Sequence, residues 1–523
     1  MKARVLLFFV LAVWAAAPSH AHVGSPDVFY EGKVGPWPAR ITIRMPAVVP
    51  GLAEIVAQVQ SREPVSVTFT PLSSRVALSN APPPEIAQPV RGETNLYTGE
   101  LWLMTMGAYS IEVRVKGESG KGEVQIPVNS VAIAQLPLPP WLGEMLLVLG
   151  LVLFCGGMAI VASAAGESTL SPGVLPGETE RRKYWTGALV TGVVLSLALV
   201  GGKKWWEVDE KDFRSRLRSG GWPELAADVR AEGSQRILRL VLGKTALGSG
   251  SPQQSLALAP DHGKLLHLFL VGLPNHQSFG HIHPVRRDES TFEVPLPRLP
   301  EGDYDLFCDL TLESGLSSTA TNRIRIPASP GNSATPGGTY LEPDPDDSWA
   351  GDSTVAVRES PGGDTICRLP DGTQVSWKAH PALRAKQDAG LRFEIRNPAG
   401  QIADLQPYMG MMSHAAVLRA DGRVFAHLHP SGNYSMAAQM FFDAKLASET
   451  GTATSDGAMA AGMDHSKMDH AMMGHAPHQD PSEAQSRVIS LPYEFPTPGE
   501  YRVWLQFKTD GRILTAIFDA TVG

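Results

Sequence analysis

Cysteine is scarce in this sequence: three of its 523 residues are cysteine, at Cys155, Cys308 and Cys367. No two of them form a Cys-x-x-Cys pair, so the zinc and redox sites built on that motif are excluded. Three cysteines also cannot provide the disulfide framework of a small secreted domain. A single bridge between Cys308 and Cys367 stays open from the sequence alone.

Several enzyme motifs are missing as well. The sequence has no phosphate-binding loop, no Gly-x-Ser-x-Gly elbow and no His-Glu-x-x-His helix. Acidic residues are scattered, so no catalytic carboxylate pair can be assigned. The net charge is −8 and no basic stripe occurs, so nucleic acid is not an expected partner. The sequence therefore predicts no enzyme activity from a known motif.

What the sequence does contain is the same histidine-bearing segment twice. Residues 258–267 align without a gap on residues 405–414, and each segment ends in a histidine. Each copy continues through an apolar stretch to a His-x-His-Pro motif, at residues 281–284 or 427–430. A duplicated module that keeps three histidines in step indicates a common role for them.

The second copy predicts how its histidines are arranged. Two apolar runs, separated by Asp421-Gly422, connect His414 to His429. This dipeptide is a strong hairpin signal, because a type I′ turn needs positive φ at both central positions. A two-residue loop there pairs His414 with His429, and strand alternation puts His427 on the same face. We therefore expect three clustered imidazoles, with opposed Cβ atoms about 4.5–5.5 Å apart.

The first copy predicts the same cluster with a longer loop. A three-residue connection at residues 274–276 would pair His267 with His283 and place His281 beside them. His262 and Met409 occupy the same position in the two copies and are candidates for a fourth ligand. The thioether of Met409 would make the second site softer, with more preference for Cu(I).

Three neutral imidazoles on a rigid β scaffold suit zinc, copper, nickel or iron. The alternative is that each histidine only packs or forms a hydrogen bond within its sheet. Duplication of the whole trio favours the metal site. We therefore predict metal ligands at His267, His281, His283, His414, His427 and His429.

An insert in the second copy, residues 450–485, narrows the choice of metal. Its glycine, alanine and methionine residues lack apolar periodicity, which predicts a flexible loop. Thioethers favour Cu(I), and imidazole accepts both copper oxidation states and zinc. Its candidate ligands are Met463, His465, Met468, His470, Met472, Met473, His475 and His478. This stretch resembles the Met/His-rich tracts of bacterial periplasmic copper-resistance proteins, which implies copper. An ordinary low-complexity loop is the alternative.

The amino terminus predicts export. Residues 1–21 have basic residues near the start, an apolar core and a small-x-small end at Ser19–Ala21, the pattern of a secretory signal. Cleavage after Ala21 would leave His22 as the new terminus, with its amine and imidazole free to bind one metal ion. In this respect alone His22 resembles the first residue of small periplasmic copper carriers. The alternative is an incidental histidine after the cleavage site.

Two more apolar runs, residues 141–162 and 184–202, are each long enough to cross a bilayer, which takes about 20 residues. Residues 163–183 would then be a cytoplasmic loop, and both large soluble regions would lie in the periplasm. The basic residues 181–183 fit the positive-inside rule, whereas Lys203-Lys204 on the other flank does not. We expect a two-pass protein of the bacterial inner membrane.

The pattern of the soluble regions predicts β structure throughout. Short runs in which apolar and polar residues alternate are separated by proline and glycine residues. The expected fold is mainly β, with three Ig-like or cupredoxin-like β-sandwich modules plus two transmembrane helices. The modules cover residues 22–138, 225–328 and 350–523, and residues 329–349 are a Pro/Gly/Asp linker.

These features predict a membrane-anchored periplasmic protein that binds copper and buffers it, delivers it or confers resistance, with zinc as the other compatible metal. A copper-handling protein of the periplasm or membrane would be its partner. Two alternatives stay open from the sequence: a copper-dependent oxidoreductase, and a structural envelope protein whose sandwiches bind a partner while the histidines are incidental.

Overall fold

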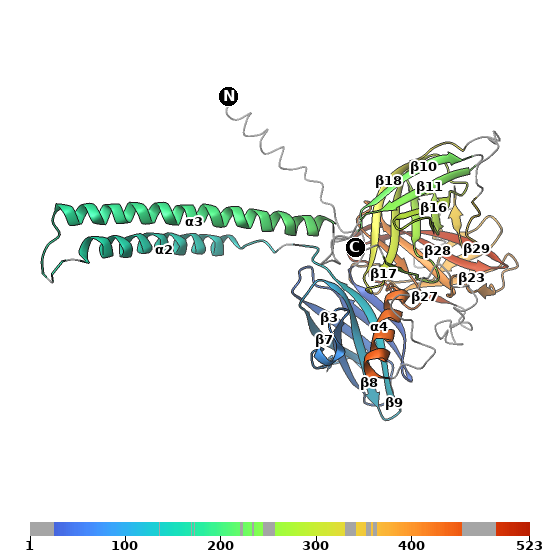
Figure 1. Ribbon diagram of the computed structural model, residues 1–523. Coiled ribbons are helices and arrows are strands. Elements are labelled where there is room, and N and C mark those ends of the chain that lie inside the picture. The colour runs from blue at the N-terminus through green and yellow to red at the C-terminus, as the bar shows by residue number, and fades with distance from the viewer. Residues whose placement is uncertain are drawn as a thin grey trace. The chain divides into compact units, whose positions relative to one another are not determined.

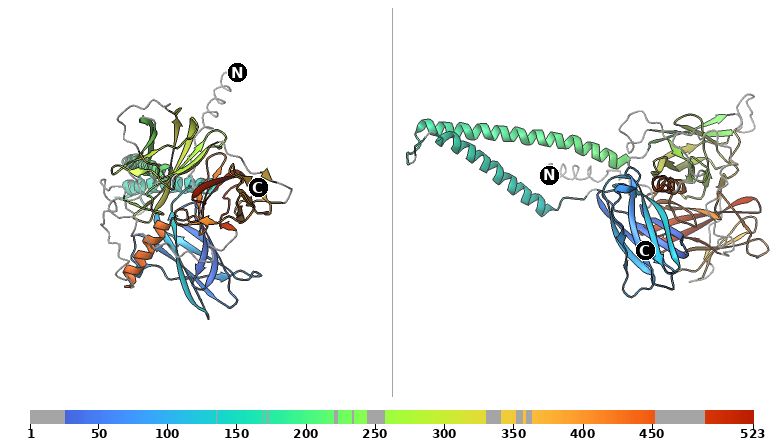
Figure 2. Two further views of the ribbon diagram at one scale, coloured as in Figure 1. Left: turned by 90° about the vertical axis from the view of Figure 1, so that its right-hand side faces the viewer. Right: turned by 60° about the horizontal axis from the view of Figure 1, so that its bottom comes forward.

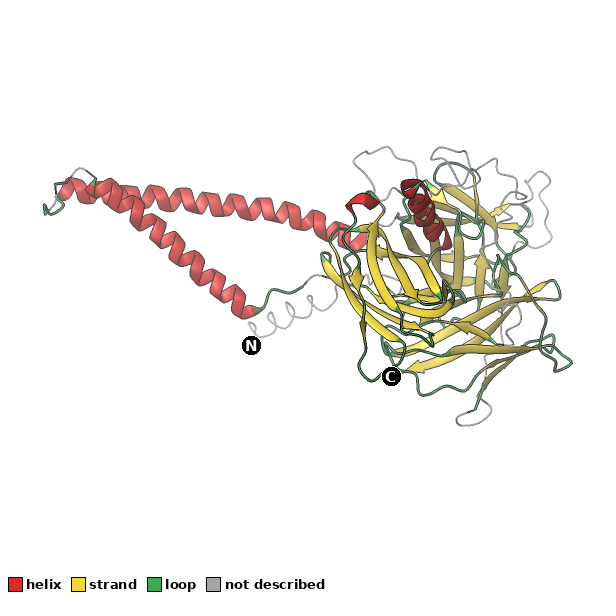
Figure 3. Ribbon diagram, turned by 90° about the horizontal axis from the view of Figure 1, so that it is seen from below, coloured by secondary structure: helices red, strands yellow, loops and turns green. Residues whose placement is uncertain are grey.

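The computed structural model describes residues 26–134, 136–168, 170–171, 173–219, 223–232, 235–243, 257–329, 341–351, 357–358, 363–451 and 488–523. The expected signal sequence, His22 and the Met/His tract at residues 463–478 lie outside these residues. The chain divides into two compact units, residues 134–219 and the remainder. Antiparallel strands dominate the larger unit (Figure 3), so the mainly β fold is confirmed.

Two helices make up the smaller unit, α2 (Pro140–Glu167) and α3 (Glu178–Ser219). They run side by side (Figure 1) and pack against each other near their connection. There Gly187 of α3 faces Ala165 of α2. Each contains a stretch long and apolar enough to cross a membrane, with mean hydropathy of 2.6 in α2 and 1.7 in α3. Both helices are longer than the spans that the sequence predicted.

The amino-terminal module consists of two antiparallel sheets around one core. Alternation of buried and accessible residues is clearest in the third strand, as expected for a strand with one face on the core. One sheet has the order β1 (Val28–Val34), β2 (Trp37–Arg44), β3 (Gly51–Val59), β7 (Leu96–Leu103), β6 (Gln88–Pro89). The other has the order β5 (Glu85–Ile86), β4 (Ser66–Ser73), β8 (Gly107–Gly117), β9 (Gly120–Ser130), and a short helix η1 (Leu78–Asn80) follows β4.

The middle module also has two sheets around a shared core. The first has the order β10 (Leu225–Glu232), β11 (Gln235–Leu242), β16 (Thr291–Pro295), β15 (Val285–Arg286). The second has the order β12 (Leu258–Ala259), β17 (Gly302–Leu312), β13 (His267–Gly272), β14 (Phe279–Ile282), β19 (Ser348–Ala350), with β18 (Ser317–Ile326) also paired to β17. Strand β19 comes from the end of the segment expected to be a linker.

The last module repeats this arrangement. One sheet has the order β20 (Val357–Arg358), β21 (Thr365–Arg368), β22 (Gln374–Trp377), β23 (Leu391–Arg396), β27 (Ile489–Leu491). The other has the order β24 (Leu405–Gln406), β28 (Gly499–Thr509), β25 (Ser413–Arg419), β26 (Phe425–Leu428), with β29 (Arg512–Val522) paired to β28. Cys308 and Cys367 are buried in the cores of different modules and unbonded, so the bridge left open by the sequence is not formed.

The last module also contains a helix that the β pattern did not predict, α4 (Met436–Thr450). Its ends have ordinary capping signals: the Ser435 side chain accepts a hydrogen bond from the Ala438 N–H, and Gly451 adopts φ 70°. The helix lies against β9 of the amino-terminal module (Figure 2), where the Gln439 side chain donates to the carbonyl of Gln125.

A separate apolar cluster joins the middle and last modules. It contains Phe269, Val271, Phe279 and Phe307 from the middle module, and Ala416, Leu418, Phe425, Trp504 and Ile517 from the last. Phe279 stacks on Trp504 with ring centroids 4.7 Å apart, and Phe307 stacks on Phe425 at 4.5 Å. The two contacts are equivalent under the repeat. All six residues of β13 are buried as a result, because each face of this strand packs against apolar side chains.

Candidate metal centre

Two β-hairpins carry the repeated histidines. In the first copy Leu268 pairs with Ile282, so His267 and His283 follow as neighbours one step further out. In the second copy Ala415 pairs with Leu428, which brings His414 next to His429 in the same way. The strand registers are those predicted from the loop positions.

The turn of the second hairpin differs from the expected type I′. Gly422 adopts a positive φ of 73°, but Asp421 does not, and the Gly422 N–H donates to the carbonyl of Arg419. The prediction of turn type was therefore wrong. The register survives because strand alternation and the buried face of β25 determine it, whichever turn closes the hairpin.

The histidines form two clusters on these hairpins. The ligand nitrogens within each cluster lie within 4.8 Å of one another. The first trio is His267, His281 and His283, and the second trio is His414, His427 and His429. Five of the six side chains are buried, and the His427 side chain is 9% exposed. The structure thus brings together the six residues for which the sequence predicted ligation.

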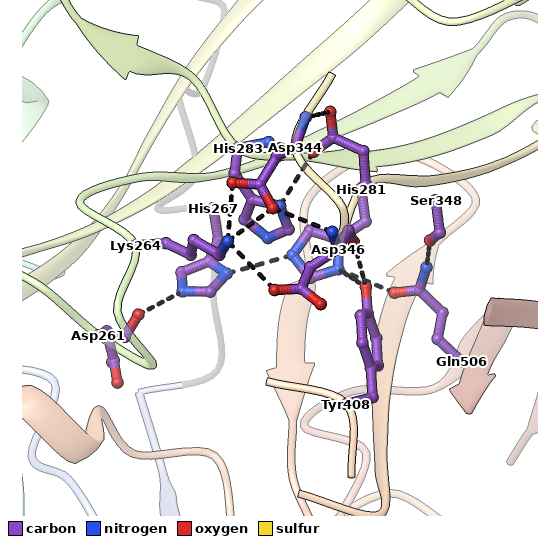
Figure 4. A network of polar contacts seen from close by, with 11 residues as sticks. Asp261, Lys264, His267, His281, His283, Asp344, Asp346, Ser348, Tyr408 and Gln506 are labelled. Carbon is purple, nitrogen blue, oxygen red and sulfur yellow. Dashed lines mark hydrogen bonds and ion pairs between the residues drawn. The ribbon is translucent and has the colours of Figure 1, made fainter. Parts of the chain in front are cut away.

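Hydrogen bonds fix the tautomers in the first trio (Figure 4). His267 Nε2 lies 3.1 Å from the carbonyl oxygen of Asp261, which can only accept, so Nε2 carries the proton. His281 Nδ1 donates to Gln506 Oε1 at 2.9 Å, and the amide nitrogen of Gln506 donates to Ser348. The other two nitrogens, His267 Nδ1 and His281 Nε2, therefore have free lone pairs, and they face each other at 3.2 Å.

The second trio repeats this geometry. His414 Nε2 donates to the carbonyl of Tyr408 at 3.0 Å. His427 Nδ1 lies 3.4 Å from a carboxylate oxygen of Asp309. His414 Nδ1, whose lone pair is free because Nε2 carries the proton, faces His427 Nε2 at 3.2 Å.

The third histidine of each trio contributes another bare nitrogen. His283 Nδ1 donates to Asp347 Oδ1 at 3.0 Å, and its Nε2 is buried without a hydrogen-bond partner. Both ring nitrogens of His429 are buried without a partner. Leaving such a group unsatisfied costs about 1–3 kcal/mol, so these nitrogens need an explanation.

A metal ion fits this arrangement. Two nitrogens that ligate one tetrahedral ion at about 2.0–2.1 Å lie about 3.3 Å from each other. The facing ring nitrogens of both trios, 3.2 Å apart, have this separation. Without a cation between them, the two free lone pairs of the first trio repel. The outer contacts of His267, His281 and His283 also match the partners that orient metal-bound imidazoles.

Burial keeps the imidazoles in the form that ligates metal. Desolvation, together with the nearby positive groups, lowers the pKa of His267 and of His283 to about 3. Desolvation and the neighbouring histidines lower the pKa of every other member of the trios well below the ordinary value. All six rings are therefore neutral at physiological pH and do not have to lose a proton to bind a metal.

Carboxylates surround the first trio in a way that the sequence did not predict. Asp344, Asp346 and Asp347 lie in the segment expected to be a linker, and Lys264 forms ion pairs with the first two at 2.6 and 3.1 Å. Asp347 accepts hydrogen bonds from both the backbone and the ring of His283. The available signal was the run of three aspartates, which we interpreted as linker composition.

Histidine 262 and Met409, the proposed fourth ligands, have the same backbone conformation, with φ 50° at each residue. The His262 side chain is 5% exposed, and its Nε2 has no hydrogen-bond partner. Its ring centroid lies 4.9 Å from that of His429, so it belongs with the histidine cluster. Met409 is buried, and a role in ligation stays a prediction for it.

Comparisons with known proteins give little on function. Residues 367–453 and 457–523 match a family described as "Domain of unknown function (DUF8832)". The match covers less than half of the chain and includes the second trio. Comparison with curated proteins gives no match.

Solved structures offer only distant similarities. The tetra-tandem repeat from the extending region of a large adhesion protein is 7% identical, with a TM-score of 0.16, over 91% of this chain and 71% of that one. Latent PorU from Porphyromonas gingivalis is 9% identical with a TM-score of 0.13, over 92% and 32%. Salmonella alpha-2-macroglobulin reacted with methylamine is 10% identical with a TM-score of 0.17, over 96% and 24%. Similarities at this level carry no argument.

Proposed function

We propose that this chain is a membrane-anchored copper-binding protein that buffers or delivers copper in the periplasm. The observation that supports the proposal most strongly is the pair of facing ring nitrogens in each trio. Both pairs are 3.2 Å apart, and in the first trio the outer hydrogen bonds of both rings leave no proton between them. A cation that binds both nitrogens relieves this repulsion.

Copper is the metal that the whole ligand set favours. Imidazole alone suits zinc as well as copper, but thioethers select the softer Cu(I). Ten of the sixteen methionines lie between Met409 and Met473, in the module that carries the second trio. The Met/His tract at residues 463–478 would capture copper for this trio.

Contacts within the larger unit support a two-pass topology. Arg40 of the amino-terminal module forms an ion pair with Asp388 of the last module at 2.5 Å, and the Asn433 side chain accepts from the Phe29 N–H. Modules that contact each other must lie on the same side of a membrane. An even number of crossings between them, as two helices provide, meets this condition. The Ig-like or cupredoxin-like assignment of the modules is part of the same proposal.

A copper-dependent oxidoreductase is the second candidate. Each trio provides three ligands, and a four-coordinate metal with three protein ligands keeps a position open for substrate. The structural alternative, with incidental histidines, is less well supported. It requires hydrogen-bond partners for buried imidazoles, and both ring nitrogens of His429 have none.

Metal analysis of the full chain in detergent tests the proposal. The double variant His281→Gln/His427→Gln removes one ring nitrogen from each facing pair. His380→Gln is the control, because the His380 ring packs against Trp377, outside the cluster. After copper loading and dialysis, the wild type and the control should retain about two more copper ions per chain than the double variant, one for each trio. Equal copper content in all three proteins would overturn the proposal.

Catalysis is tested on the same copper-loaded protein. Oxygen consumption with an added reductant that disappears in the double variant would favour the oxidoreductase. Retention of copper with no turnover would favour buffering or delivery.

A further inference from the structure

The two trios lie against each other. The ring centroid of His427 is 5.4 Å from that of His267 and 5.5 Å from that of His281. These distances across the repeats match those within a trio, such as 5.5 Å between His267 and His281. The shared apolar cluster, with its two aromatic stacks, holds the hairpins in this position.

Each repeat also orients a histidine of the other. Asp309 of the first repeat contacts His427 of the second, and Gln506 of the second accepts from His281 of the first. Asp309 and Gln506 are equivalent, since Asp309 pairs with His267 on its sheet and Gln506 pairs with His414. In each trio, therefore, one histidine has its polar partner in the other repeat. We call this arrangement the exchange of partners.

His262 lies between the trios. Its ring centroid is 6.1 Å from that of His267 in its own repeat, and 5.4 and 4.9 Å from those of His414 and His429 in the other. A positive φ is uncommon for a residue with a side chain and costs of order 1–3 kcal/mol where the surroundings impose it. The buried, unpartnered Nε2 of His262 indicates that this position is built for a ligand.

The charge around the cluster fits two cations. Asp309 and Asp347 contact histidines of the second and first trio, and Asp261 lies 3.6 Å from Nε2 of His262. Asp344 and Asp346 flank Lys264. Five carboxyl groups therefore stand against one ammonium, and the negative charge of those that are ionised offsets the mutual repulsion of two divalent ions.

We infer that the seven histidines form one binuclear copper centre shared by the two repeats, and that His262 couples its two halves. The inference rests on the proposed function and deepens it. A metal lies about 3 Å from the centroid of a ring that ligates it, so ions in the two trios would be no more than about 12 Å apart. Copper bound in one half would then sense the metal in the other.

Electron paramagnetic resonance of the full chain in detergent tests this inference. Wild-type protein is measured with one and with two equivalents of Cu(II), and each trio is isolated in the variants His281→Gln/His283→Gln and His427→Gln/His429→Gln. We expect the hyperfine lines to broaden, or the spin intensity per copper to fall, as the second equivalent binds. A two-equivalent spectrum that equals the sum of the single-trio spectra would overturn the binuclear centre while leaving copper binding intact. Failure to retain any copper would overturn both proposals.

The expected broadening is measured on the wild-type protein alone, between one and two equivalents of Cu(II). A wild-type spectrum that only doubles in intensity at the second equivalent would overturn the inference even if a variant misfolds. The role of His262 has its own comparison, His262→Ala against His276→Ala. Both residues have a positive φ, 50° and 54°, and His276 lies in the hairpin loop outside the cluster. The first variant should weaken the interaction between the two copper ions and the second should not. Equal spectra for the two variants would remove His262 from the centre.

Discussion

The carboxylate of Asp309, on β17 of the first repeat, lies 3.4 Å from Nδ1 of His427, on β26 of the second. Thr319 donates to the other oxygen of this carboxylate at 2.5 Å and holds it in place. Burial raises the pKa of Asp309 to about 7, although 22% of the side chain stays accessible. The first repeat thereby provides the polar neighbour of His427 Nδ1.

This contact predicts an effect across the repeats. Asp309→Asn should weaken copper binding at the second trio by about 10–100-fold, as loss of an outer partner does at other metal sites. The affinity is measured by competition with a chelator in the His281→Gln/His283→Gln background, which removes the first trio, and in the His427→Gln/His429→Gln background, which removes the second. Asp305→Asn is the control, because Asp305 lies on the same strand but pairs with Arg323. A loss confined to the first trio, whose His267 is the cross-strand neighbour of Asp309, would contradict the exchange of partners.

The aromatic contacts between the repeats predict a link between packing and metal affinity. Phe425→Ala should cost about 3–5 kcal/mol of unfolding free energy, the usual cost of removing a buried phenylalanine. It should also weaken copper binding, because Phe425 packs beside the trios and stacks on Phe307. Phe393→Ala is matched in burial but lies within the core of the last module. Denaturant titration should show similar destabilisation for both, and copper titration of the folded proteins should separate them.

The metal-free protein should be sensitive to acid. Burial lowers the pKa of His267 and His283 from about 6.5 to about 3, so between these pH values the unfolded chain binds protons that the folded chain excludes. The free energy of unfolding therefore falls as the pH falls through this window. Melting temperatures of the chelated protein at pH 7.5, 6 and 5 should decrease in that order. The decrease in melting temperature should be smaller in His281→Gln/His427→Gln than in the wild type, and in His380→Gln it should equal the wild-type decrease. A melting temperature that rises as the pH falls would contradict the burial of neutral imidazoles.

The proposed topology makes both ends of the chain accessible from one side. Protease added to the periplasmic face of intact cells should cleave before α2 and after α3, and the two helices should stay protected. The ion pair between Arg40 and Asp388 requires only that the two modules lie on the same side of the membrane, because it joins the module before the helices to a module after them. Protection of the carboxy-terminal half alone would mean that one helix does not span.

The hairpins could be predicted from the sequence because their strand pairing depends only on residues close together in the chain. Strand alternation puts His427 and His429 on one face, and the turn position determines that His414 joins them. The type of turn did not matter, since the register is correct although Asp421 lacks the positive φ that a type I′ turn requires.

The contact between the two trios could not be predicted in this way. It depends on contacts between aromatic residues that lie far apart in the sequence, such as Phe279 and Trp504. Strand alternation predicts that each of these residues is buried, but it does not predict which residue packs against it. The contact of Asp347 with His283 was not predicted for a related reason. A segment rich in proline and aspartate has the composition of a linker, and only the pairing of β19 with β14 shows that it belongs to the sheet. Helix α4 was missed although Ser435 and Gly451 are ordinary capping signals.

The Met/His tract leads to the last prediction. Its soft ligands should capture copper and pass it to the second trio, and the chain on both sides of it is held by α4 and β27 of the same module. Tethering makes this transfer intramolecular, at a local concentration of about millimolar for a short link. Deletion of residues 463–478 should therefore slow copper loading of the second trio, as followed by stopped-flow absorbance, and leave the melting temperature of the metal-free protein nearly unchanged.

A variant of unchanged length separates ligand chemistry from tether length. It has leucine for the methionines and asparagine for the histidines of the tract, at Met463, Met468, Met472, Met473, His465, His470, His475 and His478. If the soft ligands of the tract cause the fast loading, this variant should bind copper at the second trio as slowly as the protein that lacks residues 463–478. Neither protein can hold Cu(I) near the trio. Loading at the wild-type rate in both proteins, with unchanged copper stoichiometry, would leave the tract without a role in metal capture and the paired histidine trios as the whole of the copper site.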